Sequence, residues 1–131
     1  MKGFIADLEE LTEHNDNFRK VLYTGKNLQL VLMSLQPGQE IGIETHREHD
    51  QFFRVEKGKG VIEIEGVRTR IKGDYAVIVP AGARHNLINT GDKPLRVYTL
   101  YAPPEHRDGL VQRERLDAKG FVEHFDGVTT E

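Results

Sequence analysis

The 131-residue sequence predicts an all-β fold, a double-stranded β-helix or jelly roll, with a short N-terminal helix and a polar C-terminal tail. Two observations lead to this class. Short apolar segments follow one another from residue 18 to residue 101, and turns rich in glycine or proline separate them. Strands at such even spacing favour a sandwich or barrel over alternating βαβ units.

The first segment, residues 1–17, is expected to be helical over residues 4–14. Phe4, Ile5, Leu8 and Leu11 recur at helical spacing, with acidic residues between them. The pattern changes to that of strands at Phe18, which marks the predicted start of the barrel.

The barrel is predicted to occupy residues 18–104. Its expected strands are residues 21–23, 28–35, 41–46, 52–55, 61–64, 76–79 and 95–101. The run Gly58-Lys59-Gly60 is interpreted as a hairpin turn, because no helix start follows it as in a phosphate-binding loop. Asn89 is interpreted as a turn residue before Thr90-Gly91.

The composition becomes polar after Pro103-Pro104, so residues 105–131 are predicted to form a C-terminal extension. A weak helical pattern over residues 113–119 is ended by Gly120. The extension could pack on the barrel, pack on a second subunit or be partly mobile, and the sequence leaves these alternatives open.

Charge and composition exclude several partners. The formal net charge of -3 provides no basic face for a nucleic acid backbone. No apolar run approaches the roughly 20 residues of a membrane span, and the first residues lack an apolar signal core. The absence of cysteine excludes disulfides and thiolate ligands, and fits the cytoplasmic location that we expect.

Four ligand-type side chains are expected to converge at one end of the barrel. Glu44 and His46 are two residues apart and therefore share a strand face. Gln51 opens the next strand, and His85 begins another after the Pro80-Ala81-Gly82 corner. Such convergence from different strands is the arrangement that a mononuclear metal needs.

These residues stand in two motifs that resemble those of the cupin superfamily. Residues 38–58 read G-x5-E-x-H-x4-Q-x6-G, against the family's G-x5-H-x-H-x3,4-E-x6-G, so Glu44 replaces a histidine and Gln51 a glutamate. Residues 73–89 follow G-x5-P-x-G-x2-H-x3-N with one extra residue before Pro80. The resemblance covers residues 28–101. It implies a cupin barrel and one divalent metal held by Glu44, His46, Gln51 and His85.

The donor set suits Mn, Fe, Co, Ni or Zn, because it combines two imidazoles with oxygen ligands. Two histidines and one carboxylate also form the composition of oxygen-activating iron sites. The alternative is a metal-free cluster joined by hydrogen bonds. A buried Glu44 beside two histidines would be costly without a cation, which favours the metal.

The preferred function is a metal-dependent enzyme for a small polar, oxygen-rich substrate such as a sugar acid or keto acid. Isomerase-type, lyase-type and oxygen-dependent reactions all remain open, and Glu44 is the candidate catalytic base. A non-catalytic module that binds a small ligand or metal is the alternative, and a structural metal is a third possibility. Ile41 and Ile43 are expected to face away from the site, which predicts a homodimer that covers them.

The remaining polar residues receive less specific predictions. Glu48 and His49 lie in the turn before Gln51, and solvent exposure is expected for both. His106 is expected to be a solvated loop residue. Alternation does not decide which face three other side chains occupy: Arg54, Tyr98 and Tyr101.

Overall fold

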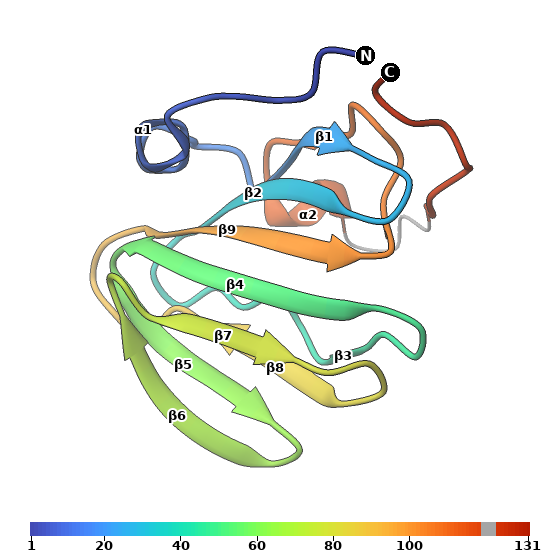
Figure 1. Ribbon diagram of the computed structural model, residues 1–131. Helices are drawn as coiled ribbons and strands as arrows, with labels where there is room; N and C mark the ends of the chain where they lie inside the picture. Colours follow the sequence, from blue (N-terminus) through green and yellow to red (C-terminus); the bar gives the residue numbers. More distant parts are fainter. Residues whose placement is uncertain (119–122) are drawn as a thin grey trace.

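Two antiparallel sheets form the body of the protein in the computed structural model, which describes residues 1–118 and 123–131 (Figure 1). The six-stranded sheet has the order β10-β1-β2-β9-β4-β7, and the four-stranded sheet has the order β3-β8-β5-β6. The bounds of the first sheet, in that order, are Val111–Gln112, Arg19–Thr24, Gln29–Leu35, Leu95–Ala102, Asp50–Lys57 and Ala76–Val79. Those of the second sheet are Glu44–Thr45, Arg84–Ile88, Lys59–Ile64 and Val67–Lys72. The predicted all-β double-stranded β-helix is confirmed.

The core lies between the two sheets and follows from strand alternation. Along β4, Gln51, Phe53 and Val55 are buried, and the residues between them are only partly so. Phe53 and Val55 are fully buried, and each contributes roughly 1.5–3 kcal/mol of hydrophobic stabilisation. Gln51 is therefore the polar end of an otherwise apolar inward row, as its position at the start of the strand predicts.

The N-terminal helix is shorter than predicted. Helix α1 spans Leu8–Glu13, and the side chain of Asp7 caps it by accepting a hydrogen bond from the Glu10 amide at 3.2 Å. Because an N-cap has a non-helical backbone, the helix cannot begin before Asp7. Phe4 and Ile5 precede the cap and are 40% and 96% exposed.

Two strand predictions need correction. The expected strand over residues 41–46 is reduced to β3, Glu44–Thr45, because Gly42 has a φ of +102°. Strand β6, Val67–Lys72, was missed, since Ile71 is its only buried residue and the strand therefore lacks an apolar alternation.

The predicted hairpin at Gly58-Lys59-Gly60 is wrong. Strand β4 belongs to one sheet and β5 to the other, so this segment is a corner between sheets. A Cβ atom at Gly60 would lie 2.4 Å from the backbone oxygen of Ile88. Glycine is required at this position because two backbones pass too close for any side chain.

The C-terminal extension packs on the barrel where it is described. Strand β10, Val111–Gln112, pairs with the edge of β1, and the backbone amide of Thr130 donates to Thr24. Helix α2 spans Arg115–Ala118, and the rest of the predicted helix, with Gly120, lies outside the described residues. The division into segments 1–17, 18–104 and 105–131 stays a prediction.

Among the described residues, no helix has the length and apolar character that a membrane crossing requires. The cytoplasmic location stays a prediction.

Candidate metal centre

Three predicted ligands meet at one end of the barrel. Glu44 on β3 and His85 on β8 are direct cross-strand partners, and His46 lies one residue beyond β3. One candidate ligand atom from each residue lies within 4.8 Å of those of the other two. The backbone amide of Gly82 donates to the His46 carbonyl oxygen at 2.8 Å, which joins the two sequence motifs. The predicted convergence of Glu44, His46 and His85 is therefore present.

Gln51 lies against the same cluster from β4. Its Oε1 atom is 3.1 Å from His85 Nε2, and its Nε2 atom donates to Thr99 Oγ1 at 3.0 Å. His85 Nδ1 donates to the carbonyl oxygen of Ala83 at 3.0 Å. A neutral His85 then carries its lone pair on Nε2, so two acceptors face each other. A cation placed beside them would satisfy both atoms, which is the chemistry expected of a metal site.

The ionisation states at the centre favour ligation. Burial lowers the pKa of His85 and thereby favours the neutral imidazole that a metal requires. Burial raises the pKa of Glu44, but the hydrogen bond and charge of His46 outweigh it, so the net pKa is lowered. The pair is joined by a contact of 3.0 Å between His46 Nε2 and Glu44 Oε2. Glu44 is therefore a carboxylate over most of the pH range.

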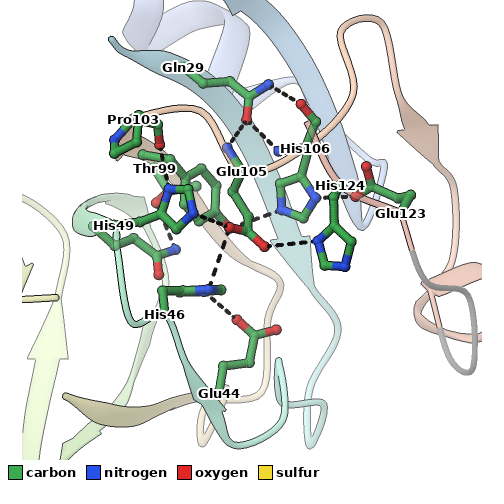
Figure 2. A network of polar contacts seen from close by, with 12 residues as sticks. Gln29, Glu44, His46, His49, Thr99, Pro103, Glu105, His106, Glu123 and His124 are labelled. Atoms are coloured by element: carbon green, nitrogen blue, oxygen red, sulfur yellow. Dashed lines mark hydrogen bonds and ion pairs between the residues drawn. The ribbon is translucent and has the colours of Figure 1, made fainter. Parts of the chain in front are cut away.

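A second layer of polar groups surrounds Glu105, just beyond the end of β9 (Figure 2). Its Oε2 atom is 2.8 Å from His49 Nε2 and 3.9 Å from His46 Nδ1, and its Oε1 atom is 3.7 Å from His124 Nδ1. His49 Nδ1 donates to the carbonyl oxygen of Pro103 at 2.8 Å. Glu105 thus links three histidines, one of which is a candidate ligand.

Two expectations of solvent exposure are wrong. His49 is half-buried because it is held by Glu105, whereas Glu48 is exposed as predicted. His106 is only 8% exposed, since Nδ1 contacts Glu123 and Nε2 lies 3.3 Å from the Tyr101 hydroxyl. Glu105 and Glu123, which hold these two histidines, lie outside both motifs, so spacing within the motifs does not reveal them.

Tyr101 points into the barrel, with its ring 5.7 Å from that of His46. Arg54 and Tyr98 alternate with the inward residues of β4 and β9 and are half-buried on the other face. Asn89 donates to the carbonyl oxygens of Leu35 and Lys93, which confirms its structural role in the turn.

A cavity of about 440 Å³ opens beside Glu44 and His46. The C-terminal extension forms much of its wall, through Glu105, His106 and residues beyond them. Arg19 of β1 also lines it. The sequence analysis missed Arg19 and Glu105 as site residues. For Arg19 a signal existed, because it lies two residues before the inward-facing Val21 and therefore shares its face.

The apolar residues before the site divide between core and surface. Ile41 is 7% exposed and belongs to the core cluster, so the expectation that it faces outward is wrong. Ile43 is 55% exposed, but it lines the same cavity as Glu44, so the expectation that it faces away from the site is also wrong.

Two bacterial proteins are similar to the chain in sequence. The uncharacterized protein YrkC of Bacillus subtilis is 42% identical over 123 residues, covering 89% of this chain and 66% of YrkC. The tetracenomycin polyketide synthase protein TcmJ of Streptomyces glaucescens is 30% identical over 78 residues, covering 60% of this chain and 52% of TcmJ. The chain thus spans two thirds or less of these two relatives.

A solved structure extends the similarity to nearly the whole fold. The crystal structure of BH2720 from Bacillus halodurans has a TM-score of 0.90 and 40% identity, covering 92% of this chain and 96% of that protein. The family model described as "Cupin domain" matches residues 31–101, which include both motifs and all four candidate ligands. The chain therefore belongs to the cupin-domain family.

Proposed function

We propose that this protein is a metal-dependent enzyme that acts on a small polar, oxygen-rich molecule, such as a sugar acid or keto acid. The observation that carries the proposal is the convergence of Glu44, His46 and His85 beside an open cavity. Gln51 adds a neutral amide oxygen from the neighbouring strand. A site that opens onto a cavity leaves space for a substrate, as catalytic centres require.

Glu44, His46, Gln51 and His85 would hold one divalent transition metal, with Mn, Fe, Co, Ni and Zn as candidates. When bound, such a metal polarises a carbonyl group or lowers the pKa of a water molecule. The buried Gln51 and His85 come from strands of the rigid barrel, which holds their side chains in place.

Glu44 is also the proposed catalytic base, a role that it would take by leaving the metal. Its carboxylate lines the cavity, and its lowered pKa keeps it ionised at neutral pH, which is the form that can accept a proton. This role suits an isomerase-type or lyase-type reaction that begins with removal of a proton next to a carbonyl group. Oxygen-dependent chemistry is the variant that an iron-loaded site would favour. The relative TcmJ is named as a polyketide synthase protein, which supports an enzymatic role.

A specific observation favours the alternative, a non-catalytic module for a small ligand or metal. Without any ion, Glu44 contacts His46 at 3.0 Å. If the Gln51 amide is turned over, its nitrogen donates to His85 and its oxygen accepts from Thr99. The four side chains then satisfy one another, as in a metal-free cluster.

Elemental mass spectrometry of protein purified without an affinity tag separates these proposals. We expect about one equivalent of a transition metal in the natural chain and loss of it in His46→Ala. His14→Ala, which removes an exposed histidine, is the matched control and retains the metal. Absence of metal from the natural chain, even after incubation with Mn, Fe(II), Ni and Zn, would favour the non-catalytic module. Metal-loaded protein is then screened against sugar acids and keto acids, and turnover is followed by proton NMR.

A homodimer is also proposed. Ile43 on the site face and Ile78 on the edge strand β7 are 55% and 70% exposed, and a second copy could cover such apolar side chains. Light scattering at micromolar concentration tests this proposal, and a monomeric mass would contradict it.

A further inference from the structure

Arg19 is a buried cation at the cavity wall. It lies on β1, between Phe18 and the exposed Lys20, and its side chain is directed to the inner side of the sheet with that of Val21. Only 6% of Arg19 is exposed, yet it lines the same cavity as Glu44. An arginine this deeply buried is rare unless a charge of opposite sign accompanies it.

The side chain of Arg19 has one hydrogen-bond partner in the described part of the chain. Nη1 donates to Oε1 of Gln112, its register partner on β10, at 2.7 Å. Nε is buried without any acceptor among the described residues. No described carboxylate lies within ion-pair distance of the guanidinium. Gln112 is neutral, so the positive charge of Arg19 has no counter-ion in direct contact.

The carboxylates of the cavity wall already have partners. Glu44 contacts His46, Glu105 contacts His49, and Glu123 contacts His106. Glu123 also accepts a hydrogen bond from the backbone amide of Arg107 at 2.8 Å. An anion from outside the chain would therefore meet Arg19 without displacing an existing ion pair.

A second guanidinium lies at the wall of the same cavity. Arg115 of α2 lines the same cavity, and its Nε donates to the backbone oxygen of Glu40 at 2.8 Å. The ring of Phe18 lies 5.2 Å from the guanidinium carbon of Arg19 and 5.8 Å from that of Arg115. Phe18 thus holds both cations beside the cavity through its ring face.

We propose that Arg19 binds the carboxylate of the substrate, so that the natural substrate is an organic acid whose other oxygen groups approach Glu44 and His46. The placement of the other oxygen groups near Glu44 and His46 rests on the proposed function. The anion site itself is formed by β1 and β10 and does not depend on it. A single guanidinium matches the charge and planar geometry of one carboxylate. A phosphate monoester carries about two charges and would call on Arg115 as well, but Nε of Arg115 is already bonded to the backbone oxygen of Glu40.

Two matched pairs of small molecules test the inference by NMR titration of zinc-loaded protein. Pyruvate is compared with pyruvamide, and glucuronate with glucose, so that each acid has a neutral counterpart of similar shape. We expect at least one acid to bind at least ten times more tightly than its counterpart. Arg19→Gln should weaken binding of that acid 10- to 100-fold, while zinc content stays at one equivalent.

Two further variants separate loss of the anion site from loss of the fold. Gln112→Glu places a carboxylate beside Nη1 and supplies Arg19 with an internal counter-ion, so acid binding should fall about tenfold with Arg19 still present. Arg107→Gln removes the same charge from an exposed position and should leave acid binding unchanged.

The outcomes distinguish this inference from the proposed enzyme. If zinc binds but Arg19→Gln and Gln112→Glu bind the acids like the natural chain, the inference is wrong and the metal site stands. If acids bind through Arg19 in protein treated with EDTA and no metal ever binds, the inference stands without the enzyme. Absence of binding by both acids, or tighter Arg19-dependent binding of inorganic phosphate, overturns the assignment of a carboxylate.

Discussion

The two ends of the barrel differ in packing and in how their polar groups are satisfied. At the end where β4 passes into β5, backbones lie in direct contact, and a Cβ atom at Gly58 would lie 2.6 Å from the Pro94 oxygen. Asn89 completes this end with hydrogen bonds to Leu35, Lys93 and the Gly91 amide. Every polar atom of the Asn89 side chain thus has a partner, as a structural end requires.

The other end contains buried polar groups for which the chain does not supply every hydrogen-bond partner or counter-ion. His85 and Gln51 direct acceptors at each other, and Arg19 lacks a counter-ion among the described residues. The comparison teaches that one end stabilises the fold, whereas the other retains polar groups that the proposed ligands would satisfy. Substitutions at the first end should therefore change the free energy of unfolding, and substitutions at the second should change ligand affinity.

The largest effect is expected from His85→Ala. Loss of an imidazole ligand should lower zinc affinity at least 100-fold, because the remaining donors do not supply two nitrogens. Competition with a fluorescent chelator measures the affinity. Unchanged affinity would show that the site end does not bind metal through His85, and His14→Ala provides the control.

Gly60→Ala should lower the stability of the fold and leave zinc binding unchanged. Its Cβ atom would overlap the Ile88 oxygen, so we expect the free energy of unfolding to fall by about 2–3 kcal/mol. Zinc stoichiometry should not change, because Gly60 lies at the end away from the site. Urea unfolding measures the loss. Gly73→Ala is the matched control, since its Cβ atom would lie at an ordinary 3.6 Å from the Glu56 oxygen.

Glu105→Gln tests whether Glu105 binds the metal directly or only contacts a residue that does. Glu105 reaches a candidate ligand only through His46 Nδ1, at 3.9 Å. We expect zinc affinity to fall about tenfold, with one equivalent still bound at saturation. Complete loss of zinc would make Glu105 a ligand instead. Glu48→Gln, at an exposed position nearby, should have no effect.

The smallest effect concerns the pH dependence of metal-free protein. The pKa of Glu44 is lowered and that of His46 is raised, after opposing burial effects, by their mutual contact. The stabilisation from Glu44 is present above its ordinary pKa of 4.5 and lost as pH falls through the lowered value. That from His46 is complete below 6.5 and lost as pH rises through the raised value.

Glu44→Gln should therefore reduce the unfolding free energy by about 1 kcal/mol near pH 5.5 and by less at alkaline pH. Thermal unfolding of the variant and the natural chain at both pH values measures the difference. A difference that grows toward alkaline pH would contradict the assigned pair.

The sequence predicted strands with a buried, alternating face well and mostly exposed strands poorly. Strands β4 and β9 have clear alternation because one face of each meets the core, and they were found close to their observed positions. Strand β6 has mostly exposed residues, so pairing with β5 determines it and its own pattern does not. Helix α1 was overextended, since apolar spacing continues across the Asp7 cap.

The sequence by itself determined the fold class and the four candidate metal ligands. Period-two alternation and turn spacing act over a few residues, so Glu44, His46, Gln51 and His85 could be identified as candidates without coordinates. Their convergence was expected from the strand pattern, and the family resemblance carried by the two motifs implied the same ligand set.

Only the tertiary structure decided which groups surround the four candidate ligands. Arg19 and Glu105 reach the same cavity from β1 and from beyond β9, and the register of β1 with β10 brings Gln112 to Arg19. Strand order and loop packing depend on contacts between distant segments, and local periodicity contains no information about them. The chain's residue spacing therefore indicates the candidate metal centre, whereas long-range pairing builds the cavity wall around it.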